Sequence, residues 1–175
     1  MEIGDWLFSN LQSPISNIQS SMLLPLLFIF LAFLADRLTK LWAAQFLAAN
    51  GPTQVHALLT IRETYNRGIA LGLFQGIGPI VGWLTVFVVL GMVVYMVRLP
   101  WEQWLARLGL AILIGGALGN LVDRVFVGQV LDFIETPLRP GIFNVADVMI
   151  YLGLALVLAG SFLQKGTRDD VMRDA

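Results

Sequence analysis

Four segments of the chain are long and apolar enough to cross a membrane, and this constrains the fold more than any other feature of the sequence. A spanning helix needs about 20 mostly apolar residues. The four segments are residues 22–44, 77–97, 105–122 and 144–163. The second is the clearest because it contains no charged residue. The sequence therefore predicts an all-α membrane protein with four transmembrane helices.

Composition agrees with a lipid environment and excludes several kinds of site. The chain is 57% hydrophobic and 13% charged, whereas soluble domains carry about 25% charged residues. A formal net charge of −1 argues against a nucleic-acid partner, which would favour a basic surface. There is no cysteine and His56 is the only histidine, which excludes thiolate and multi-histidine metal sites. The composition therefore offers no metal site of these two kinds.

The length predicts one domain with two flanking segments. Residues 1–21 contain no Lys or Arg and so do not resemble a signal peptide. They are expected to form either a poorly ordered extension or a short helix on the membrane surface, and both alternatives remain open. Residues 22–165 are expected to form the helical domain, and residues 166–175 a charged tail.

The connection between the first two helices is unusually long. Residues 45–76 include Gly51-Pro52, then the β-branched and apolar stretch Ala57–Tyr65, then a glycine-rich stretch at 68–76. This order predicts a short strand or small sheet followed by a turn. Long connections in compact domains are more often functional than idle, so we expect a β-containing extramembrane segment that contributes to function.

Charged residues concentrate at one end of the predicted bundle. Because the helices alternate in direction, the ends that carry these residues share one membrane face, and the link between the third and fourth helices joins them there. An ionisable group at membrane depth costs about 2.5–3.5 kcal/mol, so such a group is a functional candidate. The residues that form this cluster are Asp36, Lys40, Asp123, Arg124, Asp132, Glu135 and Asp147.

Part of this cluster has a structural explanation. Asp36 and Lys40 are four residues apart, which suits an ion pair on one helix face. Asp123 and Arg124 are adjacent and cannot face each other, but Asn120 lies close enough along the helix to hydrogen-bond either one. For these residues a scaffolding role and a role in a site both remain open.

Asp132 and Asp147 are harder to explain as scaffold. Asp132 stands in an apolar run without a basic neighbour, and Asp147 lies in the first turn of the fourth helix, where the helix dipole also favours a carboxylate. Two carboxylates at the edge of a low-dielectric region would share a proton, as in aspartic proteases. No serine lies on this face, so carboxylates are the expected machinery of any hydrolase here.

Five strings of the sequence resemble the lipoprotein signal peptidases, also called signal peptidase II. They occur in the order of that family and span about residues 22–165. After Asn66, Gly68-Ile69 and Leu71 stand where the family more usually has small or aromatic residues, which bears on substrate fit and not on the two aspartates. The strings are DRLTK at 36–40, YNRGIA at 65–70, GGALGNLVDR at 115–124, VLDF at 130–133 and FNVAD at 143–147.

The resemblance implies a monomeric aspartic endopeptidase of the bacterial inner membrane that needs neither a metal nor an organic cofactor. Such an enzyme removes the signal peptide of lipidated prolipoproteins on the amino side of a diacylglyceryl-modified cysteine. It implies Asp132 and Asp147 as the catalytic pair and a substrate cradle at residues 45–76. It also places both termini in the cytoplasm and the catalytic pair near the outer face. The basic residues do not decide this orientation, because the two membrane sides carry nearly equal numbers of them. The residues implied to line or support the site are Asn66, Gly68, Asn120, Asp123, Arg124, Asn144, Asp36 and Lys40.

Two other classes of function remain open. A small transporter or proton-relay protein also uses membrane carboxylates, although its sites are expected nearer the bilayer midplane and often with internal repeats. The other alternative is a purely structural membrane subunit. It is disfavoured because placing so many charges together at membrane depth costs free energy.

Overall fold

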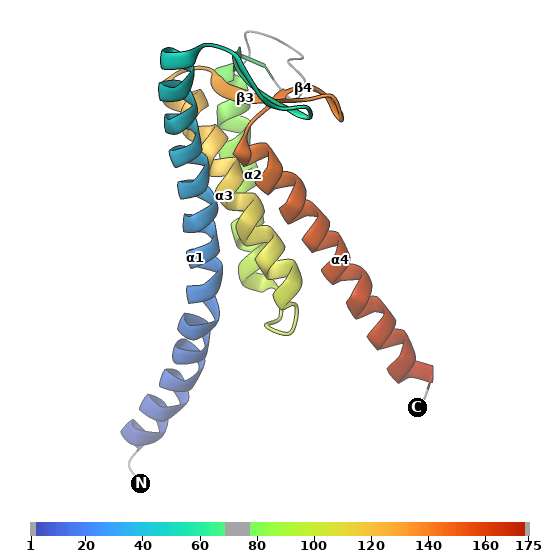
Figure 1. The fold of residues 1–175 in the computed structure, drawn as a ribbon. Coiled ribbons are helices and arrows are strands. Elements are labelled where there is room, and N and C mark those ends of the chain that lie inside the picture. Colours follow the sequence, from blue (N-terminus) through green and yellow to red (C-terminus); the bar gives the residue numbers. More distant parts are fainter. Residues whose placement is uncertain (1–2, 69–77, 174–175) are drawn as a thin grey trace.

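The computed structural model describes the backbone of residues 3–68 and 78–173. Its four helices each contain a segment long and apolar enough to span a membrane. They run roughly alongside one another, with the start of α1 and the end of α4 at the end opposite to the sheet (Figure 1). The predicted fold class is confirmed. The helices are α1 (Ile3–Asn50), α2 (Gly78–Arg98), α3 (Trp104–Phe126) and α4 (Val145–Arg173).

Two helices are longer than the sequence predicts. We expected residues 1–21 to be poorly ordered or to form a separate surface helix, but α1 begins at Ile3 and passes through Pro14 without a break. At the other terminus α4 continues through the charged tail to Arg173. The glycine-rich turn predicted at 68–76 falls almost wholly outside the described residues.

A four-stranded antiparallel sheet covers one end of the helices (Figure 1). The first two strands, β1 (Thr53–His56) and β2 (Leu59–Asn66), lie in the long connection where a small sheet is predicted. The other two, β3 (Val130–Thr136) and β4 (Arg139–Phe143), lie in what we expected to be a short link between α3 and α4. Pairing of β2 with β3 joins the two connections into one cover over the bundle.

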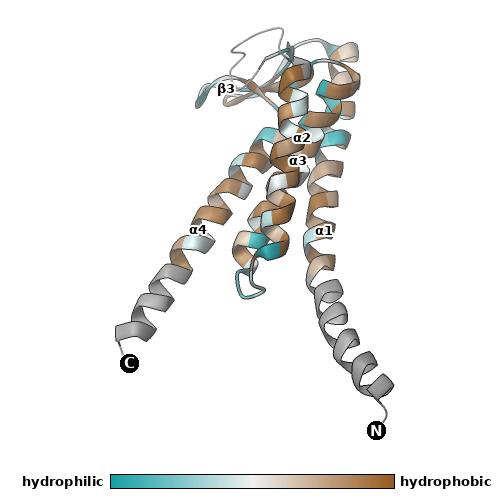
Figure 2. Cartoon of the chain, turned by 180° about the vertical axis from the view of Figure 1, so that it is seen from behind, coloured by the Kyte–Doolittle hydropathy of each residue, from teal (hydrophilic) through white to brown (hydrophobic). Residues whose placement is uncertain are grey.

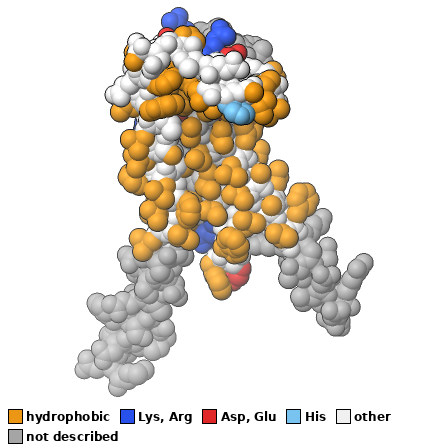
Figure 3. Space-filling model, viewed as in Figure 1, with side chains coloured by type: hydrophobic (Ala, Val, Ile, Leu, Met, Phe, Trp, Pro, Cys, Tyr) orange, Lys and Arg blue, Asp and Glu red, His pale blue; other side chains and the backbone are white. Residues whose placement is uncertain are grey.

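Helix α3 is the centre of the bundle. In the apolar 18-residue stretch of α3, 61% of the residues are buried, against 17% in the corresponding stretch of each of the other three helices. The other helices therefore present apolar side chains outward. Figure 2 shows that the described parts of the helices are mostly hydrophobic, and Figure 3 shows the apolar surface below the sheet. Glycines allow the close packing: a Cβ on Gly116 would lie 2.7 Å from the carbonyl oxygen of Ala146, and one on Gly119 would meet the Asp36 carboxylate. These contacts bring α1, α3 and the start of α4 together beneath the sheet.

Candidate active site

Two carboxylates and two cations form a buried network where α1 meets α3. Lys40 Nζ lies 3.0 Å from Asp36 Oδ2 and 2.6 Å from Asp123 Oδ2. Arg37 binds the same two carboxylates, at 3.1 Å from Asp36 Oδ2 and 2.7 Å from Asp123 Oδ1. The predicted pairing of Asp36 with Lys40 is confirmed, and the balance of two positive and two negative charges makes their burial tolerable.

Asp36 also links α1 to α4. Its side chain is fully buried, and its Oδ1 accepts a hydrogen bond from the Ala146 backbone N–H at 3.2 Å. The N–H groups of the first helical turn have no partner within their own helix, so this carboxylate satisfies one of them. The ion-pair network is therefore connected directly to the helix turn that carries Asp147.

Asp147 takes the helix-start position that the sequence left open, and its second carboxylate oxygen bonds Asn120. Asn144 precedes α4, and its Oδ1 accepts the Asp147 backbone N–H at 3.0 Å, while Asp147 Oδ2 accepts the Asn144 backbone N–H at 3.3 Å. This reciprocal arrangement is a capping box. The other oxygen, Oδ1, accepts the Asn120 Nδ2 at 3.0 Å. Helix capping thus fixes the carboxylate, and one oxygen faces the interior of the site.

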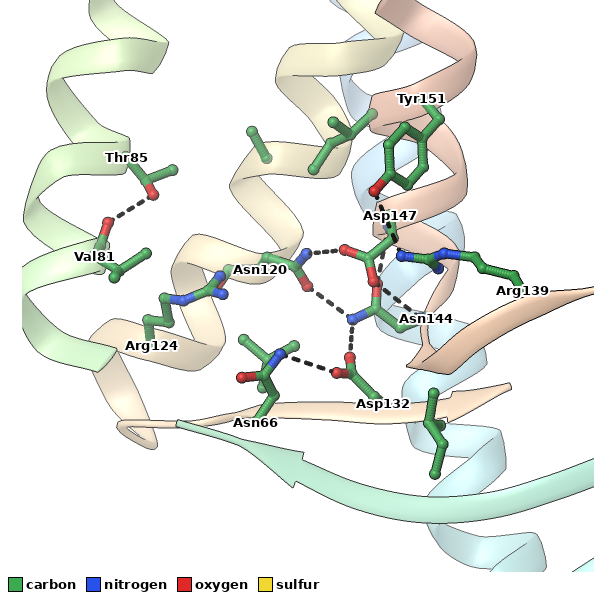
Figure 4. Close-up of a pocket in the computed structure, with 14 residues that line it drawn as sticks. Asn66, Val81, Thr85, Asn120, Arg124, Asp132, Arg139, Asn144, Asp147 and Tyr151 are labelled. Atoms are coloured by element: carbon green, nitrogen blue, oxygen red, sulfur yellow. Dashed lines mark hydrogen bonds between the residues drawn. The ribbon is translucent and has the colours of Figure 1, made fainter. Parts of the chain in front are cut away.

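Asp132 is buried on β3 and is held by amides, with no ion pair to a basic side chain in the described part of the chain. Its Oδ1 accepts Asn144 Nδ2 at 2.6 Å and its Oδ2 accepts Asn66 Nδ2 at 3.3 Å. Burial, and next the negative charge of Asp147, raise the pKa of Asp132 to about 6, against the opposing effect of the two amides and of Lys40. Asn144 therefore lies between the two aspartates (Figure 4), because its side chain donates to the Asp132 carboxylate and accepts the Asp147 backbone N–H.

The orientation of the Asn120 amide follows from chemistry. Lys40 Nζ, which can only donate, lies 2.9 Å from Asn120 Oδ1. The oxygen of this amide must therefore face Lys40, and its NH₂ group must face Asp147. The spacing would allow the Asn120 side chain to bond Asp123 or Arg124, but it bonds Lys40, Asn144 and Asp147 instead. Arg124 Nη1 donates to the Asn120 backbone oxygen at 3.4 Å.

Backbone donors orient the other two amides in the same way. The Gly68 N–H donates to Asn66 Oδ1 at 2.9 Å, so the NH₂ group of Asn66 faces Asp132. The Asp147 N–H fixes Asn144 Oδ1, so the NH₂ group of Asn144 also faces Asp132. Each of the three amides therefore donates to a carboxylate oxygen of the pair.

If Lys40 orients Asn120, the Lys40→Met variant should turn over substrate roughly tenfold to a hundredfold more slowly at unchanged KM, since small misplacements of catalytic groups cost about that much. Arg37→Met is the matched control: it removes a cation from the same network without touching Asn120. It should lose comparable thermal stability while its kcat stays within about twofold of wild type. Equal losses of kcat in both variants would contradict an orienting role for Lys40.

A cavity of about 270 Å³ connects these groups beneath the sheet. Asp132 and Asp147 lie on one of its walls, with Arg124 and Arg139 on opposite sides of the pair (Figure 4). Its apolar lining comes from three helices and from the connection between α3 and α4, and the connection between α1 and α2 contributes the polar Asn66. Besides the aspartates and arginines, the lining residues are Val81, Thr85, Ala117, Val130, Ile142, Ile150, Tyr151, Asn66, Asn120 and Asn144.

The structure separates the predicted site residues into three groups. Four of them line the cavity with the two aspartates, namely Asn66, Asn120, Arg124 and Asn144, whereas Asp36, Lys40 and Asp123 do not line it. Gly68 contributes its backbone, donating to Asn66 and accepting Arg124 Nη2 at 3.3 Å. Glu135, predicted on the same face, lies apart from the cavity and pairs with Arg62 at 3.6 Å on the exposed sheet.

Sequence reasoning missed Arg139 and Tyr151. Both line the cavity, but neither falls in one of the five strings, and Arg139 reaches the site only because β4 folds back over the helices. A basic residue that stands between Pro137 and Pro140 carries no spacing signal. Only the sheet pairing could have located it.

Comparisons with known proteins indicate one family. A family model described as signal peptidase (SPase) II matches residues 28–163. A lipoprotein signal peptidase of Sinorhizobium fredii is 35% identical over 81% of this chain and 89% of its own length. One from Caldanaerobacter subterraneus subsp. tengcongensis is 41% identical over 78% of this chain and 93% of its own. Among solved structures, a bacterial membrane enzyme superposes with a TM-score of 0.72 at 25% identity, covering 82% of this chain and 90% of that one.

Proposed function

Because the chain belongs to the signal peptidase II family, we propose that it removes the signal peptide of prolipoproteins by aspartic chemistry, cutting on the amino side of a diacylglyceryl-modified cysteine. The observation that carries this proposal is the placement of Asp132 and Asp147 on either side of Asn144 in one cavity. Residues 22–165 form the peptidase domain, acting as a monomer in the bacterial inner membrane with both termini cytoplasmic.

In the proposed reaction, one aspartate acts as a base and the other as an acid. A raised pKa favours Asp132 as the holder of the shared proton, whereas Asp147 caps a helix N-terminus, where the dipole favours a carboxylate. Asp147 then takes a proton from the attacking water, and Asp132 donates its proton to the oxygen of the scissile carbonyl. The two exchange roles when the leaving amine is protonated.

The location of the cavity favours a peptidase over a transporter. Substrate-binding sites of transporters are expected near the bilayer midplane, but here Asp132 lies on β3 and Asp147 in the first turn of α4. Figure 1 shows β3 and the start of α4 at the sheet end of the helices. Apolar side chains from α2, α3 and α4, including Val81, Ala117 and Ile150, line the cavity below them. A lipid-bearing peptide segment could thus place its acyl chains along the helices and its scissile bond beside the pair.

The proposal predicts a rate with a bell-shaped pH dependence on a lipidated prolipoprotein. As the pH rises through about 6, Asp132 loses its proton and the free enzyme loses its acid, so kcat/KM should fall on the basic side near that pH. The basic limb of the kcat profile should lie at a higher pH, because bound substrate excludes water and so disfavours a second negative charge on the aspartate pair. The acid limb reports protonation of both groups.

The measurement is the initial rate of signal-peptide release across pH in detergent, with and without a chelator, checking folding at each pH. The chelator should have no effect, since no group of three or more His, Cys, Asp or Glu in the described residues could hold a metal ion. Chelator inactivation reversed by added zinc, or a rate independent of pH between 4 and about 8, would refute the shared-proton mechanism.

A further inference from the structure

Arg139 extends from the start of β4 into the cavity that holds the two aspartates. Its guanidinium carbon lies 4.6 Å from the centre of the Phe143 ring and 5.3 Å from that of Tyr151. One nitrogen, Nη2, donates to the Tyr151 hydroxyl at 3.4 Å. Aromatic faces attract a cation without neutralising it, so the two rings hold the guanidinium in place.

No ion pair among the described residues involves Arg139. A guanidinium has five N–H donors, and the long bond to Tyr151 uses one of them. Arg124, on the other side of the pair, differs because it donates to the backbone oxygens of Asn120 and Gly68. Arg139 therefore presents donors to the cavity, whereas Arg124 is engaged by the protein backbone.

The charge of the cavity indicates which ligand would accept these donors. A phosphate or carboxylate ligand would be repelled by the carboxylate pair across the same cavity. A carbonyl oxygen is a neutral acceptor and avoids that repulsion. Prolipoprotein substrates carry such oxygens both in the peptide backbone and in the two esters of the diacylglyceryl group.

We infer that Arg139 is a substrate-binding residue, whose guanidinium, held over Phe143 and Tyr151, donates to a carbonyl oxygen of the lipid-modified segment of the substrate. The inference rests on the proposed function, and it adds a specificity residue outside the catalytic pair. Arg139 acts on binding and not on proton transfer, since it donates to neither aspartate.

Kinetics of Arg139→Met test the inference, because methionine keeps the aliphatic length and removes the donors. We expect KM for a lipidated prolipoprotein to rise on the order of tenfold, equivalent to about 1.4 kcal/mol, with kcat within about twofold and an unchanged pH profile. Arg139→Lys keeps the charge but lacks the planar set of donors, so its KM should lie between those of wild type and Arg139→Met. Arg62→Met, which alters an exposed arginine of the same sheet, should match wild type.

Binding measurements separate affinity from turnover. In an Asp132→Asn background, which should bind substrate without cutting it, adding Arg139→Met should weaken the Kd by the same factor of about ten. A substrate with ether-linked chains identifies the acceptor: if Arg139 binds an ester, wild type should lose affinity for it and Arg139→Met should cause no further loss. If it binds a peptide carbonyl, Arg139→Met should weaken both substrates equally.

Two outcomes would overturn the inference. One is an unchanged KM and Kd in Arg139→Met; the other is a lower kcat at unchanged KM, which would place Arg139 in the proton chemistry. If Arg139→Met loses thermal stability, Arg139→Lys is measured in its place. An unchanged KM and Kd in Arg139→Lys would also overturn the inference. Cleavage by the wild-type protein in the same assay tests the proposed function independently of the result for Arg139.

Discussion

Replacing either Asp132 or Asp147 by asparagine is expected to reduce cleavage of a lipidated prolipoprotein by at least about a thousandfold, since positioned acid–base groups contribute about 10²–10⁴ each and act as a unit. The fold should survive. An asparagine at 147 can still accept the Asn144 N–H that caps α4, and one at 132 keeps an oxygen for Asn144 Nδ2.

Glu135→Gln is the matched control for this prediction. It removes a carboxylate from the same strand, but from the exposed side where Glu135 pairs with Arg62. Its rate should equal that of wild type. Substantial cleavage by either aspartate variant, with folding verified by thermal denaturation in detergent, would remove that residue from the catalytic pair.

Asp36→Ala should lower the stability of the protein by about 3 kcal/mol, the loss expected when one partner of a buried ion pair is removed. Asp36 is fully buried and accepts bonds from Lys40, from Arg37 and from the Ala146 backbone, so its loss loosens α1 from the start of α4. Lys40 would keep Asp123 as a partner, which limits the effect.

Thermal denaturation in detergent measures this effect, with Glu135→Ala as the control. That variant removes an exposed pair, which contributes only about 0–1 kcal/mol. Any activity that Asp36→Ala loses should return when it is assayed at lower temperature, where the variant is folded. An Asp36→Ala protein with wild-type stability but no turnover would contradict the structural role and indicate a part in the chemistry.

Periodicity and composition were sufficient to predict the helices because lipid exposure imposes long apolar runs. They also located β2, since residues 57–65 are rich in β-branched residues. Strands β3 and β4 were missed because their pairing is not local: Val130–Thr136 is too short to be recognised between two helices, and it becomes a strand by pairing with β2, more than sixty residues earlier. The continuation of α1 through Pro14 has no counterpart in the sequence pattern.

The site shows the same division between local and long-range information. Charge placement predicted the Asp36–Lys40 pair because its partners lie on one helix face. It could not predict that Lys40 also binds Asn120, since that contact depends on how closely α1 approaches α3 at Gly119. Arg139 was invisible for a related reason, because only the fold of β4 brings it to the cavity.

Mass spectrometry of the cleavage products tests the central claim most directly. The purified protein would be incubated in chelator-containing detergent with a diacylglyceryl-modified prolipoprotein and, separately, with the same chain lacking the lipid. The account predicts one cut, on the amino side of the modified cysteine, in the lipidated substrate alone, and none with Asp132→Asn or Asp147→Asn. Cleavage at another bond, equal cleavage of the unmodified chain, or the same product from the aspartate variants would contradict it.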